Sequence, residues 1–405
     1  MGTTIGIFLM VGITVYLLRK RVNIGLIMLI DSACIIFIQG MPFDAAVNAF
    51  VKGGLSSKTI GLMLIVYLIM MLEMMMRKKG MIQEITDSLK HLLRSNRKAA
   101  ALLPMVIGML PSPGGARLSC PMVEEMTGES DGQSIKAFVN FWFRHAWRDG
   151  FILYPGLIIA AEIIEVDSLY LCLHIIPFML IAILIGIFLG VLKIKKEKIE
   201  DVPNDKEDVK KFMINFFPIL FVIGLYMLLL GLGLRNYGLQ IACLATIVIL
   251  MIWKKYNGVQ IREVMKQAFS PKFLFIILGV MVFKEVLFAS QILDRLPEMA
   301  EKYHISKFLL FIILPYIGGF STGIMVSAVS IAFPILLPFG LADNIWYGTI
   351  AFIAATTGIM TSPLHLCAVM TSDYFSVSLN RVLFRTMLAE SLMMLAVIAT
   401  IFLVS

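Results

Sequence analysis

The chain has 405 residues, of which 59% are hydrophobic and only 15% charged, and its mean hydropathy is +0.89. Soluble domains are typically about 45–50% apolar and about 25% charged. A water-soluble fold of this composition would expose a largely apolar surface, which excludes a cytosolic enzyme and a disordered chain. The net charge of +8 does not indicate a nucleic-acid partner, because Lys and Arg gather at the ends of apolar segments. We therefore expect a multi-pass protein of the inner (plasma) membrane, most of which is surrounded by lipid.

The first apolar run, 3–18, precedes the basic cluster Arg19-Lys20-Arg21. A cleaved signal peptide has its positive charge first, so this order predicts a retained helix with its N-terminus outside. Further apolar runs predict helices that span, or nearly span, the bilayer, since spanning takes about 20 residues. They cover 22–40, 58–76, 149–165, 169–192, 212–233, 236–253, 271–288, 343–360 and 378–404.

A charged segment divides the chain near its middle. Residues 193–211 contain seven lysines and six acids, which predicts a cytoplasmic linker between an N-terminal unit, 1–192, and a C-terminal unit, 212–405. Two amphipathic segments, about 80–95 and 289–303, are too polar to span and are expected to lie in the membrane interface.

The two halves carry matching sequence features. Leu103-Pro104 corresponds to Leu314-Pro315 at an offset of 211 residues, and Gly150 corresponds to Gly358 at an offset of 208. Repeats at about half the chain length are typical of secondary transporters.

Charge indicates how the two repeats are oriented. The loop 77–98 holds seven Lys and Arg residues and is predicted to be cytoplasmic, whereas 289–307 holds three, offset by three acids, and is predicted to be external. We therefore expect an all-α polytopic membrane protein with two inverted-topology repeats and with both termini outside.

Proline and glycine interrupt each half twice. The segments 99–128 and 305–341 are predicted to be re-entrant hairpins, with tips at 111–115 and 318–323. The segments 134–165 and 343–375 are predicted to be discontinuous helices, with breaks at 154–156 and 361–363. Because lipid offers no partner to free backbone groups, such breaks face protein or a water-filled cavity. Counting from the breaks to Glu165 and Asp373 places both near the middle of a bilayer about 30 Å thick.

The tips and breaks predict the binding site for a substrate or coupling ion. Hydroxyl and carbonyl oxygens there suit Na⁺, with Ser112 and Ser362 as its nearest candidates. The Arg148 guanidinium suits a carboxylate or phosphate, but it is equally suited to pair with Asp149, and both interpretations stay open. The predicted site residues are Ser112, Gly114, Gly115, Asn140, Arg148, Asp149, Tyr154, Ser321, Thr322, Thr361, Ser362 and His365.

Four stretches together resemble one known family. They are 110–121 (LPSPGGARLSCP), 140–145 (NFWFRH), 154–156 (YPG) and 362–367 (SPLHLC). They resemble an uncharacterised prokaryotic integral-membrane family, domain of unknown function 401. The resemblance implies a place in the ion-transporter superfamily, beside divalent-anion, citrate, gluconate and arsenite carriers. It also implies a scaffold plus a transport unit with elevator-like movement, often in a homodimer. The tips lack the Ser-Asn-Thr signature of divalent-anion carriers.

The expected function is secondary active transport of a small anion, an organic acid or an oxyanion, coupled to Na⁺ or H⁺. No P-loop and no His-Glu-x-x-His motif is present in the sequence. The five cysteines have no zinc-like spacing, so no metal site other than the Na⁺ site, no cofactor and no catalytic residue is predicted. The alternative functions are an intramembrane enzyme and a channel.

Overall fold

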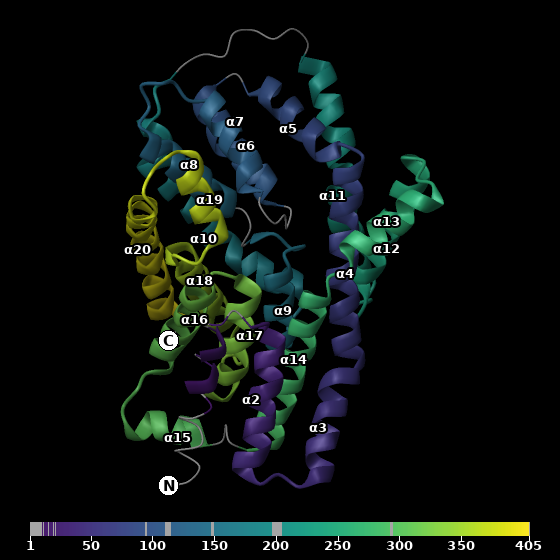
Figure 1. The fold of residues 1–405 in the computed structure, drawn as a ribbon, viewed down its shortest axis with the longest axis vertical. Coiled ribbons are helices and arrows are strands. Elements are labelled where there is room, and N and C mark those ends of the chain that lie inside the picture. Colours follow the sequence, from purple (N-terminus) through teal and green to yellow (C-terminus); the bar gives the residue numbers. More distant parts are fainter. Residues whose placement is uncertain are drawn as a thin grey trace.

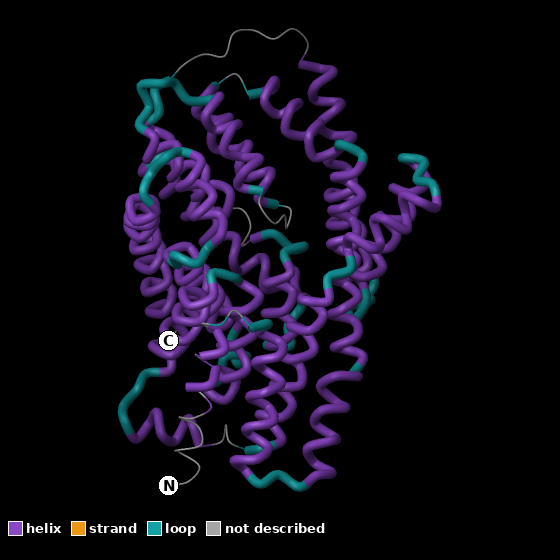
Figure 2. Tube along the Cα trace, viewed as in Figure 1, coloured by secondary structure: helices purple, strands orange, loops and turns teal. Residues whose placement is uncertain are grey.

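The computed structural model describes residues 10, 12–14, 16–18, 20, 22–93, 95–109, 115–146, 150–196, 205–291 and 295–404. The described residues are helical, with no β-strand among them (Figure 2). The N-terminal half contains α2 (Ile24–Gln39), α3 (Phe43–Leu55), α4 (Ser57–Lys78), α5 (Met81–Leu92), α6 (Asn96–Gly108), α7 (Ala116–Glu125), α8 (Gln133–Ala146), α9 (Pro155–Ile163), α10 (Ser168–Leu189) and η2 (Val191–Lys193).

The C-terminal half also consists of helices. It contains α11 (Asp205–Gly231), α12 (Gly238–Trp253), α13 (Gly258–Ala268), α14 (Pro271–Ala289), α15 (Arg295–Lys302), α16 (Lys307–Thr322), α17 (Met325–Leu336), η4 (Leu337–Phe339), α18 (Ile345–Thr361), α19 (Leu366–Tyr374) and α20 (Leu379–Val404). Residues 205–211, which the sequence assigned to the charged linker, form the start of α11. Residues 197–204 of that linker lie outside the described part of the chain.

Five helical segments among the described residues are long and apolar enough to cross a membrane. They are 43–78, 168–193, 206–231, 345–374 and 379–404. Their length and composition fit a membrane protein. Short polar caps mark several helix starts: Asn23 accepts from the Gly25 amide, and Asp167 accepts from the Leu169 amide.

The helices form two groups (Figure 1). The flanking group consists of α2, α3, α4, α11, α12, α13 and α14, in which α14 packs on α2 and α3, and α4 packs on α12. The core group consists of α6–α10 and α16–α20. The two short amphipathic helices, α5 and α15, lie at opposite ends of the molecule (Figure 1).

Two helices form the interior of the core group. Every residue of α8 from Lys136 to Ala146 is buried, and so is every residue of α18 from Gly348 to Thr361. The largest fully buried side chains include Phe138, Phe141 and Phe143 of α8. Helices that are buried on all sides belong to the centre of a bundle. The polar residues on them are consequently held away from lipid.

Candidate functional site

Each of the two central helices is followed by a break in the helix and then by a second, short helix. α8 ends at Ala146 and α9 begins at Pro155; α18 ends at Thr361 and α19 begins at Leu366. At the second break Ser362 is extended, with φ −76° and ψ 130°. Pro363 explains this conformation, because a proline disfavours helical geometry in the residue before it. Pro155 similarly occupies the first helical position of α9, where its missing N–H costs nothing.

The connection between α16 and α17 packs directly on the second break. Gly323 has a left-handed φ of +66°, and a Cβ at its position would lie 2.9 Å from the His365 backbone nitrogen. The Ser362 hydroxyl donates to the Phe320 carbonyl at 2.6 Å. Glycine is therefore required at this connection both for its φ and for the close approach of the break.

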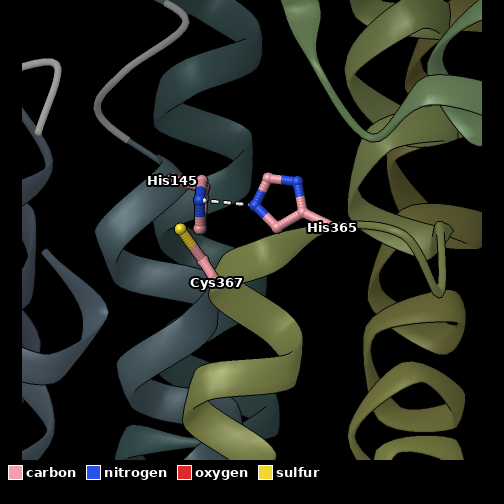
Figure 3. Close-up of side chains that lie close together, drawn as sticks. All are labelled: His145, His365 and Cys367. Carbon is pink, nitrogen blue, oxygen red and sulfur yellow. Dashed lines mark hydrogen bonds between the residues drawn. The ribbon is translucent and has the colours of Figure 1, made fainter. Parts of the chain in front are cut away.

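Two imidazoles meet at the break. His145 Nε2, on the last turn of α8, lies 3.1 Å from Nε2 of His365, the N-cap residue of α19 (Figure 3). His145 Nδ1 lies 2.6 Å from the Phe141 carbonyl oxygen, and His365 Nδ1 lies 2.9 Å from the Gly323 carbonyl oxygen. A carbonyl oxygen can only accept, so both Nδ1 atoms carry a proton and donate it.

Cys367 completes this cluster. Its Sγ and one ring nitrogen of each histidine lie within 4.8 Å of one another. His145 and His365 are buried, and Cys367 is half-buried. The Phe141 ring packs edge-on against both imidazoles, at centroid distances of 4.9 and 5.4 Å. The three ligand-type side chains thus share one enclosed, partly aromatic environment.

Asn140 lies in a second polar cluster, which joins α7, α8 and α19. Its amide nitrogen donates to Thr371 Oγ1 at 3.0 Å and to Cys120 Sγ at 3.1 Å. Asn140 is fully buried, and its Oδ1 atom has no hydrogen-bond partner among the described residues. A buried acceptor without a partner is costly in an apolar interior and is a position where a ligand can bind.

The other predicted site residues are placed differently. Thr322 and Thr361 donate to carbonyl oxygens of their own helices, at 2.7 and 2.8 Å. Ser321 is exposed, Gly115 is buried before α7, and Tyr154 is half-buried before α9. Ser112, Gly114, Arg148 and Asp149 lie outside the described residues. The structure therefore brings together Ser362 and His365 but holds Asn140 in the neighbouring cluster.

A polar cavity of about 450 Å³ lies between the flanking group and the core group. It is lined by residues of α4, α9 and α12, including Lys58 and Glu162, and by Arg235 in the connection between α11 and α12. At its edge Glu165 accepts from Lys58 at 2.9 Å and from Lys284 at 3.3 Å. The hydrogen bond from Lys58, with a further contribution from Lys284, lowers the pKa of the Glu165 carboxyl. These ion pairs join the two helix groups.

Sequence reasoning missed His145 and Cys367 as site residues. Both stand in the motifs at 140–145 and 362–367, but the two histidines are 220 positions apart. The spacing of ligand residues within one segment could therefore not predict the cluster. The two paired helix breaks could have predicted it, because residues beside both breaks are then expected to lie close together.

Comparison with family models identifies the family of this chain. No curated protein matches the chain. The model of the family described as "Protein of unknown function (DUF401)" matches residues 4–405. The chain, with its two interrupted central helices and the His145–His365–Cys367 cluster between them, therefore belongs to the DUF401 family.

Proposed function

We propose that this protein is a secondary active transporter of a small anion, an organic acid or an oxyanion, coupled to Na⁺ or H⁺. In this account α6–α7 and α16–α17 are re-entrant hairpins, and α8–α9 and α18–α19 are discontinuous transmembrane helices. The two halves are repeats of inverted topology in the inner membrane, with the linker cytoplasmic and both termini outside. No catalytic residue and no nucleic-acid partner belong to this account.

The main support is an offset of 211 residues that several equivalent helix boundaries share. α9 begins at 155 and α19 at 366, an offset of 211, and both have nine residues. α10 and α20 begin at 168 and 379, and α4 and α14 end at 78 and 289, again 211 apart. The left-handed residues Glu165 (φ 59°) and Ser376 (φ 51°) have the same offset. A register shared by these boundaries favours two copies of one structural unit.

Close backbone packing follows the same offset. A Cβ at Gly108 would lie 1.9 Å from the Arg144 carbonyl oxygen, and a Cβ at Gly319 would lie 2.3 Å from the Ala355 carbonyl oxygen. Gly108 and Gly319 are 211 apart, as are Arg144 and Ala355. Each proposed hairpin thus packs on the interrupted helix of its own half through a glycine at the equivalent position.

Contacts between the halves are reciprocal. α7 packs on α19, and α17 packs on α9. The amphipathic helices α5 and α15, at equivalent places in the two halves, lie at opposite ends of the molecule (Figure 1). Reciprocal contacts together with opposite ends favour a two-fold relation in the membrane plane, as in inverted repeats.

An anionic cargo is supported by four helix N-termini at the tips and breaks. α7, α9, α17 and α19 each begin without a side-chain cap hydrogen bond among the described residues. Their first N–H groups and helix dipoles favour negative charge. Ser112 and Ser362 are the proposed ligands of Na⁺, through hydroxyl and backbone oxygens.

The two helix groups suggest the moving parts. The core group holds both breaks and would be the transport unit, whereas the flanking group would be the scaffold and the dimer contact. The polar cavity of about 450 Å³ between them is within the range of small-molecule sites. Among the described residues, the ion pairs of Glu165 join α4 and α14 to the end of α9; an elevator-like displacement would separate them.

Ligand-dependent thermal stability tests the anion site. The purified protein is heated in detergent with succinate, citrate, gluconate, sulfate, phosphate or arsenite, each in Na⁺ and in choline buffer. A ligand at 100 times its Kd adds about 2.7 kcal/mol to the native state, which a melting curve resolves. We expect at least one anion to raise the melting temperature. Stabilisation in Na⁺ alone identifies Na⁺ as the coupling ion, whereas no shift with any anion contradicts the proposed cargo class.

A further inference from the structure

We propose that His145, His365 and Cys367 form a binding site for a thiophilic d¹⁰ metal ion, Zn²⁺ or Cu⁺. The site lies where α8 ends and α19 begins, beside the connection between α16 and α17 (Figure 3). It is distinct from the Na⁺ position proposed above, which uses oxygen ligands. Metal binding there does not require that the protein transport an anion.

The hydrogen bonds of the two imidazoles set their tautomers for metal binding. Each Nδ1–H donates to a backbone carbonyl, so in the neutral form each Nε2 presents a lone pair. These two Nε2 atoms face each other at 3.1 Å. Two lone pairs at this distance repel unless a cation is shared between them. Metal-binding histidines characteristically donate their second ring N–H to a carbonyl or carboxylate, as both do here.

The distances suit a small metal ion. With Zn–N bonds of about 2.0–2.1 Å, two imidazole nitrogens on a tetrahedral zinc ion lie about 3.3 Å apart. This is close to the 3.1 Å between the Nε2 atoms of His145 and His365. Cys367 supplies a sulfur ligand within 4.8 Å of one ring nitrogen of each histidine. Two imidazoles and a thiolate prefer Zn²⁺ or Cu⁺ over the hard cations Na⁺, Mg²⁺ and Ca²⁺, which take oxygen ligands.

A small cavity adjoins the cluster on the side of His145. Its volume is about 30 Å³, and His145, Thr356 and the buried Glu390 are among the residues that line it. His365 and Cys367 are not among its lining residues, so the three side chains themselves are the ligands that the described structure provides. One thiolate neutralises Cu⁺ and leaves a single positive charge with Zn²⁺.

The site would also join three segments of the fold. His145 belongs to α8 and Cys367 to α19, while His365 donates to Gly323 at the connection of α16 and α17. A bound ion would therefore hold the second helix break against the first and fix the neighbouring hairpin. Release or exchange of the ion would loosen the same three segments.

Metal content and cobalt spectroscopy test this proposal. The purified full-length protein is stripped with chelator, loaded with Zn²⁺ or, under reducing conditions, Cu⁺, and measured by elemental mass spectrometry. We expect about one ion per chain. Co²⁺ loaded in place of Zn²⁺ should give thiolate-to-metal charge-transfer absorption. Cys367→Ser should abolish that absorption, and His145→Gln and His365→Gln should abolish stoichiometric binding.

Matched variants and a chemical probe complete the test. Cys243→Ser changes a fully buried cysteine in α12, and His174→Gln changes a histidine of α10; both should bind metal like the wild type. If the ligand variants fail to fold, the wild-type protein still tests the proposal. Bound Zn²⁺ should protect Cys367 from modification by maleimide, which peptide mass spectrometry measures. Absence of stoichiometric Zn²⁺ and Cu⁺ binding, or binding unchanged in Cys367→Ser, overturns the proposal. The histidine pair would then share a proton.

Discussion

Gly319 of α16 packs against Ala355 of α18 so closely that a Cβ on the glycine would lie 2.3 Å from the alanine carbonyl oxygen. The contact is matched one turn away, where a Cβ on Gly358 would lie 2.1 Å from the Tyr316 carbonyl oxygen. Two helices that approach through glycine on both sides bring their backbones together, as small residues do in membrane proteins. This contact holds the α16–α17 connection against the second helix break.

Gly319→Ala should therefore destabilise the protein. The added methyl has no space, and overpacking of this kind costs about 1–3 kcal/mol. We expect a lower melting temperature in detergent, measured by circular dichroism. Gly224→Ala is the matched control, since nothing lies within 4 Å of a Cβ at that position in α11. Equal melting temperatures for both variants would contradict the packing described here.

Ser362→Ala should lose stability as well as function. The hydroxyl is fully buried and donates to the Phe320 carbonyl at 2.6 Å. Removing it deletes this part-buried hydrogen bond, which contributes about 0.5–1.5 kcal/mol. We expect a lower melting temperature and no Na⁺-dependent stabilisation by anions. Ser321→Ala, at an exposed position nearby, should melt like the wild type; a wild-type response of Ser362→Ala to anions in Na⁺ would remove Ser362 from the proposed ion site.

Glu165→Gln should reveal a pH-dependent contribution to stability. Hydrogen bonding from Lys58 lowers the folded-state pKa of Glu165, relative to an ordinary value of about 4.3. Its stabilisation is therefore complete above that value and is lost as the pH falls through the lower folded-state pKa. At pH 7 the variant should have a lower melting temperature than the wild type. The loss in free energy of unfolding is on the order of 1 kcal/mol, because the carboxylate is largely exposed.

The same difference should disappear in acid. Once Glu165 is protonated in the wild type, Gln and Glu are equivalent in charge, so the two melting temperatures should converge as the pH falls below the lowered folded-state pKa of Glu165. Glu129→Gln, at an exposed acid, should show no difference at either pH. If the difference in melting temperature between Glu165→Gln and the wild type stays constant from pH 7 into acid, the ion pairs are excluded as its cause.

Cross-linking the two helix groups should stop transport. Lys58 Nζ lies 2.9 Å from Glu165 Oε1, so Lys58→Cys and Glu165→Cys, in a background without the native cysteines, can be joined by a short thiol reagent. Uptake should be lost on cross-linking and restored on reduction, because an elevator moves one group past the other. The control pair, Glu207→Cys and Lys211→Cys, lies within α11 with 3.1 Å between the native charges and should cross-link without effect. Full uptake with the first pair joined would exclude the proposed movement.

Hydrophobic runs predicted most helices to within a few residues. The run 271–288 became α14 (Pro271–Ala289), and 378–404 became α20 (Leu379–Val404). The length of an apolar run and the charged residues at its ends determine these helix boundaries locally, so the sequence alone is enough to predict them. The short helices α3 and α13 were not predicted, because each is more polar and too short to be recognised as a span.

The details of the second break depended on packing. The match of Gly150 and Pro155 with Gly358 and Pro363 gives an offset of 208, whereas the helices on both sides follow 211. α18 continues to Thr361, and its connection to α19 is correspondingly short. Contacts of the end of α18 with the second half of α16 stabilise that extension, and no local sequence pattern contains this information. The histidine–cysteine cluster likewise arises from tertiary packing between segments far apart in the chain.

Uptake into proteoliposomes tests the central claim most directly. The protein is reconstituted, an inward Na⁺ or H⁺ gradient is imposed, and accumulation of each radiolabelled anion of the panel is followed. We predict saturable uptake of at least one anion that stops when the gradient is removed and is absent in Ser112→Ala. No uptake above protein-free liposomes, or flux that neither saturates nor depends on the gradient, would contradict a secondary transporter.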